Sequence, residues 1–142
     1  MKTLLTILAA LVVLAPSVSP DEANQEMCLC EFVAPTYELV AHFARIQGVV
    51  RVEFGLDADG VPEDPKVLES AHALLSELAL NAIKGWRFCP SSVRPDQGRM
   101  AITFRFKLEG EAPGWAPTKV VFDGSQALVE VTTPMTTATL QR

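Results

Sequence analysis

Residues 100–108 have the sequence MAITFRFKL, which is the strongest alternating pattern in the chain. Apolar side chains alternate along it with small or polar ones, which is the pattern of a strand with one buried and one solvated face. Residues 50–56 show the same alternation, with Val50, Val52, Phe54 and Leu56 on one side. The chain therefore contains at least two half-buried strands of one sheet.

Two other segments have helical periodicity. The first series ends at Gly48, a residue that suits a helix C-terminus, and the second ends at Trp86. Strands with one dry face need helices on that face only. The predicted fold is therefore α+β: a two-layer sandwich of a small antiparallel sheet of three or four strands with two helices on one face. The apolar positions are Leu39, Val40, Phe43 and Ile46, then Leu75, Leu78, Ala79, Ala82, Ile83 and Trp86.

Weaker signals add strands to this frame. Residues 28–33 alternate over a short length, and residues 66–70 are expected to return after a turn at 57–60. Near the C-terminus, residues 119–122 and 128–131 flank Asp123-Gly124, which is typical of an extra β-hairpin. Residues 132–142 are expected to form a loose tail.

The ends of the chain divide it into segments. Residues 1–19 have the features of a secretory signal: Lys2, an apolar run and small residues before a cleavage point after Ser19. An uncleaved anchor is the competing interpretation, but a helix over that run is only about 20 Å long against a hydrocarbon core of roughly 30 Å. Residues 20–27 are expected to be flexible, residues 28–110 to form one domain, and residues 111–142 to form a C-terminal extension.

Composition excludes several partners. The formal net charge is −5 and basic residues do not cluster, which disfavours nucleic acid and anionic lipid as partners.

Three cysteines in an exported chain predict one disulfide, in which either Cys28 or Cys30 pairs with Cys89. A zinc site built on these cysteines and His42 or His72 is disfavoured, because the spacing matches no closed zinc motif.

Metal binding and catalysis lack a motif as well. Asp57 and Asp59 suggest a calcium loop, but that register places Lys66 where a bidentate glutamate is required. His42, His72 and the cysteines are the only bases or nucleophiles suited to neutral pH, and no carboxylate lies at a diagnostic spacing from either histidine. We therefore expect no metal, no cofactor, no small-molecule substrate and no enzymatic activity.

Five short stretches together carry a family resemblance. They are APTY at 34–37, ARIQGVV at 44–50, DADGV at 57–61, LALNAIKGWRFCP at 78–90, and the strand at 102–108. In this order and spacing they resemble the C-terminal domain of the TonB energy transducer, over about half of the chain. The resemblance implies a periplasmic module linked to transmembrane transport.

In that family, an extended segment of an outer-membrane transporter pairs with the border of the sheet at its last strand. A border strand offers unpaired main-chain groups for affinity and alternate side chains for selectivity. The corresponding strand is 100–108, and its basic side chains would favour an acidic or neutral peptide. The alternative is a solvated face that blocks aggregation. The expected peptide-binding residues are Arg99, Ala101, Thr103, Arg105 and Lys107.

Departures from the family pattern limit these expectations. The sequence has no proline-rich spacer and no long membrane helix, so energy transduction by this molecule alone is not expected. An envelope adaptor or folding-support protein without a transport role is the alternative function. If the C-terminal hairpin pairs with residues 100–108, that border is occupied and strand addition has to use another one.

Overall fold

The computed structural model describes residues 27–137 except residues 38, 95, 97 and 114–116. The expected signal segment, and residues 20–26 of the segment expected to be flexible, lie outside this part. None of the helices described has the length and apolar character needed to cross a membrane. The elements in chain order are β1 (Leu29–Glu31), α1 (Leu39–Phe43), β2 (Gly48–Leu56), β3 (Pro62–Ser70), α2 (Ala73–Lys84), β4 (Arg87–Phe88), the 3-10 helix η2 (Pro90–Ser92), β5 (Met100–Pro113), β6 (Lys119–Asp123) and β7 (Leu128–Thr137).

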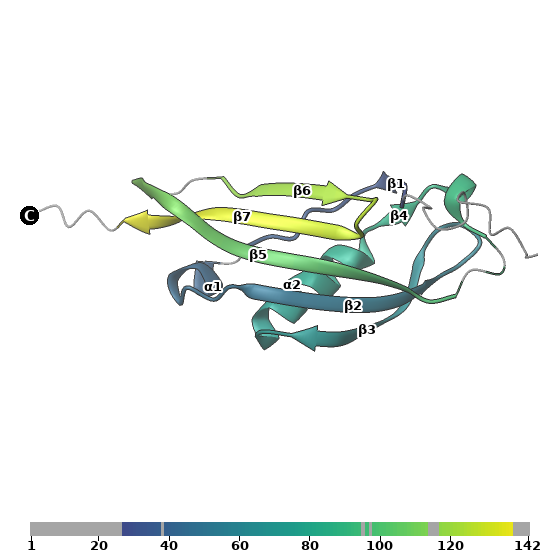
Figure 1. The fold of residues 1–142 in the computed structure, drawn as a ribbon, viewed down its shortest axis with the longest axis horizontal. Coiled ribbons are helices and arrows are strands. Elements are labelled where there is room, and N and C mark those ends of the chain that lie inside the picture. The colour runs from purple at the N-terminus through teal and green to yellow at the C-terminus, as the bar shows by residue number, and fades with distance from the viewer. Residues whose placement is uncertain (1–26, 38, 95, 97, 114–116, 138–142) are drawn as a thin grey trace, which may run out of the picture.

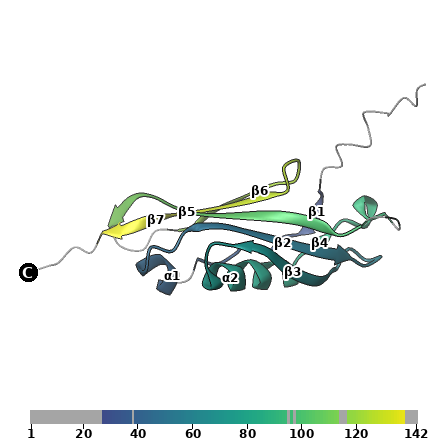
Figure 2. The same ribbon diagram turned by 60° about the horizontal axis from the view of Figure 1, so that its bottom comes forward.

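The α+β class is confirmed. A five-stranded sheet has the order β3-β2-β5-β7-β6, and β1 pairs with β4 in a separate two-stranded sheet (Figure 1). Both helices lie on the same face of the large sheet (Figure 2). The expected antiparallel sheet of three or four strands is corrected in two respects, because the sheet has five strands and β7 runs parallel to β5.

The core forms where α2 packs on β2 and β5. The apolar stripe of α2 is buried as predicted, and Trp86 directly after it is fully buried. Its ring stacks on Phe104 at 5.6 Å between centroids, and its indole N–H donates to the Val33 carbonyl at 2.8 Å. Apolar burial of this kind is the main stabilising term of a small domain.

The first helix differs from its prediction. α1 ends at Phe43, because Arg45 has a positive φ of 54° and the chain turns before Gly48. Ala41 faces the core and is fully buried, whereas Val40 and Phe43 are exposed. A five-residue helix has too few turns for its apolar spacing to identify the packed face.

The C-terminal hairpin forms, and β7 lies between β5 and β6. β7 continues to Thr137, so the prediction of a loose tail from residue 132 was wrong over that part. Its alternation explains why: Val129, Val131 and Thr133 are all buried against the core side. β-branched residues fit a pleated, buried surface, and the threonines extend the strand.

The burial of β7 predicts a measurable contribution to stability. Val131→Ala should lower the free energy of unfolding by about 2 kcal/mol, because it removes fully buried methyl groups and leaves a cavity. Val121→Ala is the matched control in β6, where the side chain is 48% exposed, and its effect should stay within about 0.5 kcal/mol. Urea unfolding of both variants measures the difference. Equal effects would contradict the interior position of β7.

Candidate functional site

The strand expected to form the border of the sheet lies in its interior. β5 pairs with β2 over Met100–Phe106 on one side and with β7 over nine residue pairs, from Thr103 to Pro113, on the other. The residues expected to bind a peptide are therefore on, or next to, an interior strand. Arg99 precedes β5, and Ala101, Thr103, Arg105 and Lys107 occupy its half-exposed face.

The three cations in this set have acidic partners within the chain. Arg105 and Lys107 each lie 3.5 Å from a Glu130 carboxylate oxygen on β7. Arg99 contacts the Glu53 carboxylate at 3.3 Å and donates to the Asp64 carbonyl at 2.7 Å. Half-exposed ion pairs of this kind contribute little stability, but they neutralise the charge that was expected to select an acidic peptide.

The hydrogen-bond pattern shows which main-chain groups face outward. The Thr103 amide donates to the Ala127 carbonyl, so odd-numbered residues of β7 bond to β5 and even-numbered ones bond to β6. Glu130 is opposite Val121, so Val121 bonds to β7. By the same alternation, the N–H and C=O groups of Val120 and Phe122 point away from the sheet.

The border formed by β3 is guarded. Pro62 and Pro65 lack an N–H group, and the β2–β3 register shifts twice. Proline, irregular pairing and charge are the features that prevent a border strand from pairing with another chain. The charged residues of β3 are Glu63, Asp64, Lys66 and Glu69.

Two short exposed borders near α1 are capped by side chains. Beyond the end of β6, the Pro134 carbonyl on β7 lies 2.7 Å from the His42 Nε2 atom. Beyond the end of β2, the Leu108 amide donates to the Gln47 side-chain oxygen at 3.1 Å. These contacts occupy main-chain groups that a guest strand would need.

β6 is the remaining border of the large sheet among the described residues, and it contains neither a proline nor a register shift. At its end, the outward-facing Gly124 carbonyl accepts the Met27 amide at 3.1 Å. The N-terminal segment then turns away to pair with β4, next to β6 in Figure 1. The border therefore already accepts one main-chain hydrogen bond from another segment. Next to that bond, the N–H and C=O groups of Val120 and Phe122 face outward.

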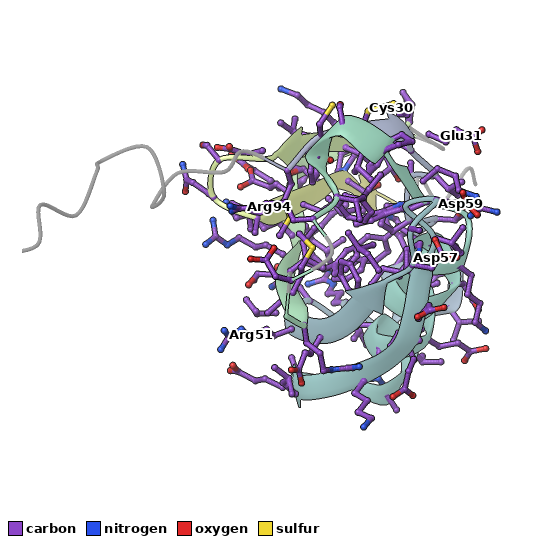
Figure 3. The ribbon with its side chains drawn as sticks, turned by 90° about the vertical axis from the view of Figure 1, so that its right-hand side faces the viewer. Cys30, Glu31, Arg51, Asp57, Asp59 and Arg94 are labelled. Carbon is purple, nitrogen blue, oxygen red and sulfur yellow. A yellow bond between two sulfur atoms is a disulfide. The ribbon has the colours of Figure 1, made fainter. Side chains whose placement is uncertain are left out.

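Apolar side chains flank this border. On the helix side of the sheet, Phe32 lies 5.9 Å from Phe122 between ring centroids and is 39% exposed. Val33, the next residue, is 45% exposed but packs against Gly85 at the end of α2 and not against β6. On the opposite face, where Arg51 points outward from β2 (Figure 3), a shallow hollow adjoins β6. It is lined by Arg105, Val121, Asp123, Gln126, Leu128 and Glu130.

The disulfide holds the N-terminal segment beneath the hairpin. Cys30 pairs with Cys89, and Cys28 is exposed with a free thiol. This resolves the choice that the sequence left open. The bridge spans a sequence separation of 59, for which chain entropy implies a stabilisation of about 4 kcal/mol. It therefore secures the position of Phe32.

The histidines have structural contacts in the described residues. His42 caps the β7 border, and the His72 Nδ1 atom accepts the Leu74 amide at 3.1 Å as the N-cap of α2. Within the described ranges, no three His, Cys, Asp or Glu side chains are grouped closely enough to hold a metal ion. The Asp57 carboxylate instead accepts the amides of Asp59 and Val61 in the β2–β3 turn.

The alternating pattern of the sequence did not reveal the border at β6. It predicted both strands of the hairpin, but not that the second would insert between the first and β5. The clue is their unequal length: β6 has five residues, whereas the alternation of Val129, Val131 and Thr133 continues through a ten-residue strand. A long strand with a fully dry face is typical of an interior position.

The turn that joins β6 to β7 contains a carboxylate with a perturbed pKa. The pKa of Asp123 is lowered below its ordinary value of 3.8, mainly because the Ser125 hydroxyl donates to its carboxylate at 2.6 Å. The amides of Ser125 and Gln126 donate to the same oxygen. The ionised form of Asp123 therefore stabilises the turn beside the border.

This predicts a pH dependence. A carboxyl whose pKa is depressed in the folded state contributes stability above its unfolded pKa and loses it as the pH falls through the folded pKa. The advantage of wild type over Asp123→Asn in melting temperature should therefore persist above about pH 5 and shrink below the ordinary pKa of 3.8. Ser125→Ala should reduce that advantage. Thermal melts between about pH 2 and 6 test this, and a pH-independent difference would contradict it.

Comparison with known proteins places these features in context. The family model for the Gram-negative bacterial TonB protein C-terminal matches residues 33–108. Protein TonB from Vibrio cholerae serotype O1 is 40% identical over 81 residues, covering 55% of this chain and 33% of that protein. Protein TonB from Klebsiella pneumoniae is 33% identical over 79 residues, covering 55% of this chain and 31% of that protein. The chain thus spans about a third of the length of these relatives.

A solved structure is also similar. The solution NMR structure of the Pseudomonas aeruginosa TonB C-terminal domain is 30% identical in sequence, with a TM-score of 0.48. The match covers 61% of this chain and 91% of that one. The family model ends at residue 108, inside β5, and the strands β6 and β7 lie beyond its range.

Proposed function

This chain belongs to the family of Gram-negative bacterial TonB protein C-terminal domains, and we propose that it is a periplasmic peptide-binding module. It takes up an extended segment of an envelope protein by strand addition at β6. The partner class is an outer-membrane transporter, which links the module to transmembrane transport. The chain acts by binding and not by catalysis.

One observation carries the proposal: β6 is the unguarded border of the large sheet in the described part of the chain. The main-chain groups of Val120 and Phe122 face outward there, whereas prolines, register shifts or side-chain caps protect the other borders. Strand addition needs such a row of unpaired groups. The bond from Met27 to Gly124 supports this, because a segment outside the sheet already uses the first position.

The flanking side chains indicate the chemistry of the guest. Residues of an added strand point alternately to the two faces of the sheet. Those on the helix side would lie beside the exposed ring of Phe32, which favours apolar side chains. Those on the other side would meet the hollow beside Val121, where Asp123 and the ion pair of Arg105 with Glu130 carry charges of both signs. The guest is therefore an extended peptide with alternate apolar residues and no strong net charge.

The test uses a photo-reactive amino acid at position 119 in the full chain. Cross-linking in an envelope extract, followed by mapping of the linked peptide, should identify an extended segment of an outer-membrane transporter. That segment is then synthesised and titrated into the protein. Val120→Pro removes an outward-facing amide and should weaken binding at least tenfold, because it deletes a main-chain bond without altering the β6–β7 ladder.

Val67→Pro is the matched control, because the pairing of Val67 with Val52 directs its amide outward on the opposite border, at β3. It should leave the affinity unchanged, with both variants first shown to melt cooperatively. Equal binding by Val120→Pro and wild type would contradict the proposal. If a chain ending at Gly110 bound the peptide more tightly than the full chain, the docking border would be β5. If cross-linking identified a partner other than a transporter, the adaptor function would be favoured.

A further inference from the structure

The three cysteine sulfurs lie together at the junction of β1 and β4. The Cys28 Sγ atom is 3.0 Å from the Cys89 Sγ atom, which is already bonded to Cys30. The Cys28 carbonyl also accepts the Cys89 amide at 2.9 Å. Cys28, directly before β1, and Cys30, within it, therefore present their sulfurs to the same partner sulfur.

The strand register explains this arrangement. Leu29 is opposite Phe88, and extending that pairing by one residue places Cys28 opposite Cys89. The register then shifts before Glu31, so that Cys30 is the additional residue of a bulge. A bulge re-aims the side chain at its position, which brings Cys30 within bonding distance of Cys89.

We propose that the bridge is exchangeable: Cys28 acts as an internal nucleophile that takes Cys89 from Cys30, so that the chain holds two interconverting disulfides. The Cys28 thiol loses its proton to water, and its thiolate attacks the Cys89 sulfur. A Cys28–Cys89 bond forms as the Cys30–Cys89 bond breaks, and the Cys30 thiolate takes a proton from water. The number of disulfides is conserved, so the step requires neither an oxidant nor a reductant.

Chain entropy does not separate the two forms. The sequence separation to Cys89 is 59 from Cys30 and 61 from Cys28, and closure entropy changes only with the logarithm of that number. The balance between the bridges is therefore set by local geometry in β1. Both forms should be populated within about tenfold of one another, because the same sulfur is in reach of both thiols.

The exchange also makes the pair accessible to other thiols. Cys28 is exposed, whereas Cys89 is buried. An external thiolate therefore attacks the outer sulfur of the bridge, which is Cys30 or, after exchange, Cys28; it forms a mixed disulfide with that sulfur and releases the Cys89 thiolate. The ligand class is a low-molecular-weight thiol or a protein dithiol of an oxidising compartment.

The experiment locates the free thiol in the full chain. Protein purified without reductant is incubated at mildly alkaline pH, quenched with acid, unfolded and labelled with a maleimide. Fragment-ion mass spectrometry then assigns the label, since no lysine or arginine separates Cys28 from Cys30 for proteolysis. We expect label at both positions in a ratio within about tenfold, reached faster at higher pH because the thiolate is the nucleophile. Label at Cys28 alone after incubation would overturn the proposal.

Serine variants provide an independent readout. Cys30→Ser should contain a Cys28–Cys89 bridge and no free thiol under denaturing conditions, as judged by thiol counting. Cys28→Ser should contain the Cys30–Cys89 bridge and serves as the matched control. Two free thiols in Cys30→Ser alongside none in Cys28→Ser would show that Cys28 does not reach Cys89 and would overturn the proposal.

Discussion

The packing of α2, and of Trp86 just beyond its end, on the apolar face of the large sheet holds the structure together. Trp86 stacks on Phe104 of β5, and the indole N–H is satisfied by the Val33 carbonyl. That hydrogen bond connects the core to the N-terminal segment as well as to the helix. Because Trp86 can be fully buried only with its N–H bonded, the segment carrying Val33 is part of the core.

The C-terminal strands widen the sheet beyond what two helices cover. The apolar face of β7, with Val129 and Val131, needs its own cover, and the residues preceding α1 provide it. A segment of this length has little independent stability, and the Cys30–Cys89 bridge secures it. The same arrangement leaves Phe32 partly exposed beside the border at β6, so the cover of the core is also a flank of the proposed docking site.

The candidate site lies where main-chain N–H and C=O groups remain unpaired at a border of the sheet. The border expected at β5 is filled by β7, and the other borders are protected by proline, by irregular register, or by His42 and Gln47. A border without such protection in a folded protein is exposed to unwanted pairing. An unprotected border at β6 therefore suits a binding role, and this is the physical basis of the proposed function.

Sequence patterns predicted the fold class, the strands at β2 and β5, the packed face of α2 and the existence of the hairpin. These follow from local periodicity, which is a property of neighbouring residues. The three-dimensional structure was needed to identify the partner of Cys89, the packed face of the short helix α1, and the insertion of β7 between β5 and β6. Strand order depends on which apolar faces meet across long sequence distances, and the longer alternation through Val129 and Val131 favours an interior position without identifying the neighbouring strands. The location of the free border, and with it the candidate site, therefore could not be derived from the residues alone.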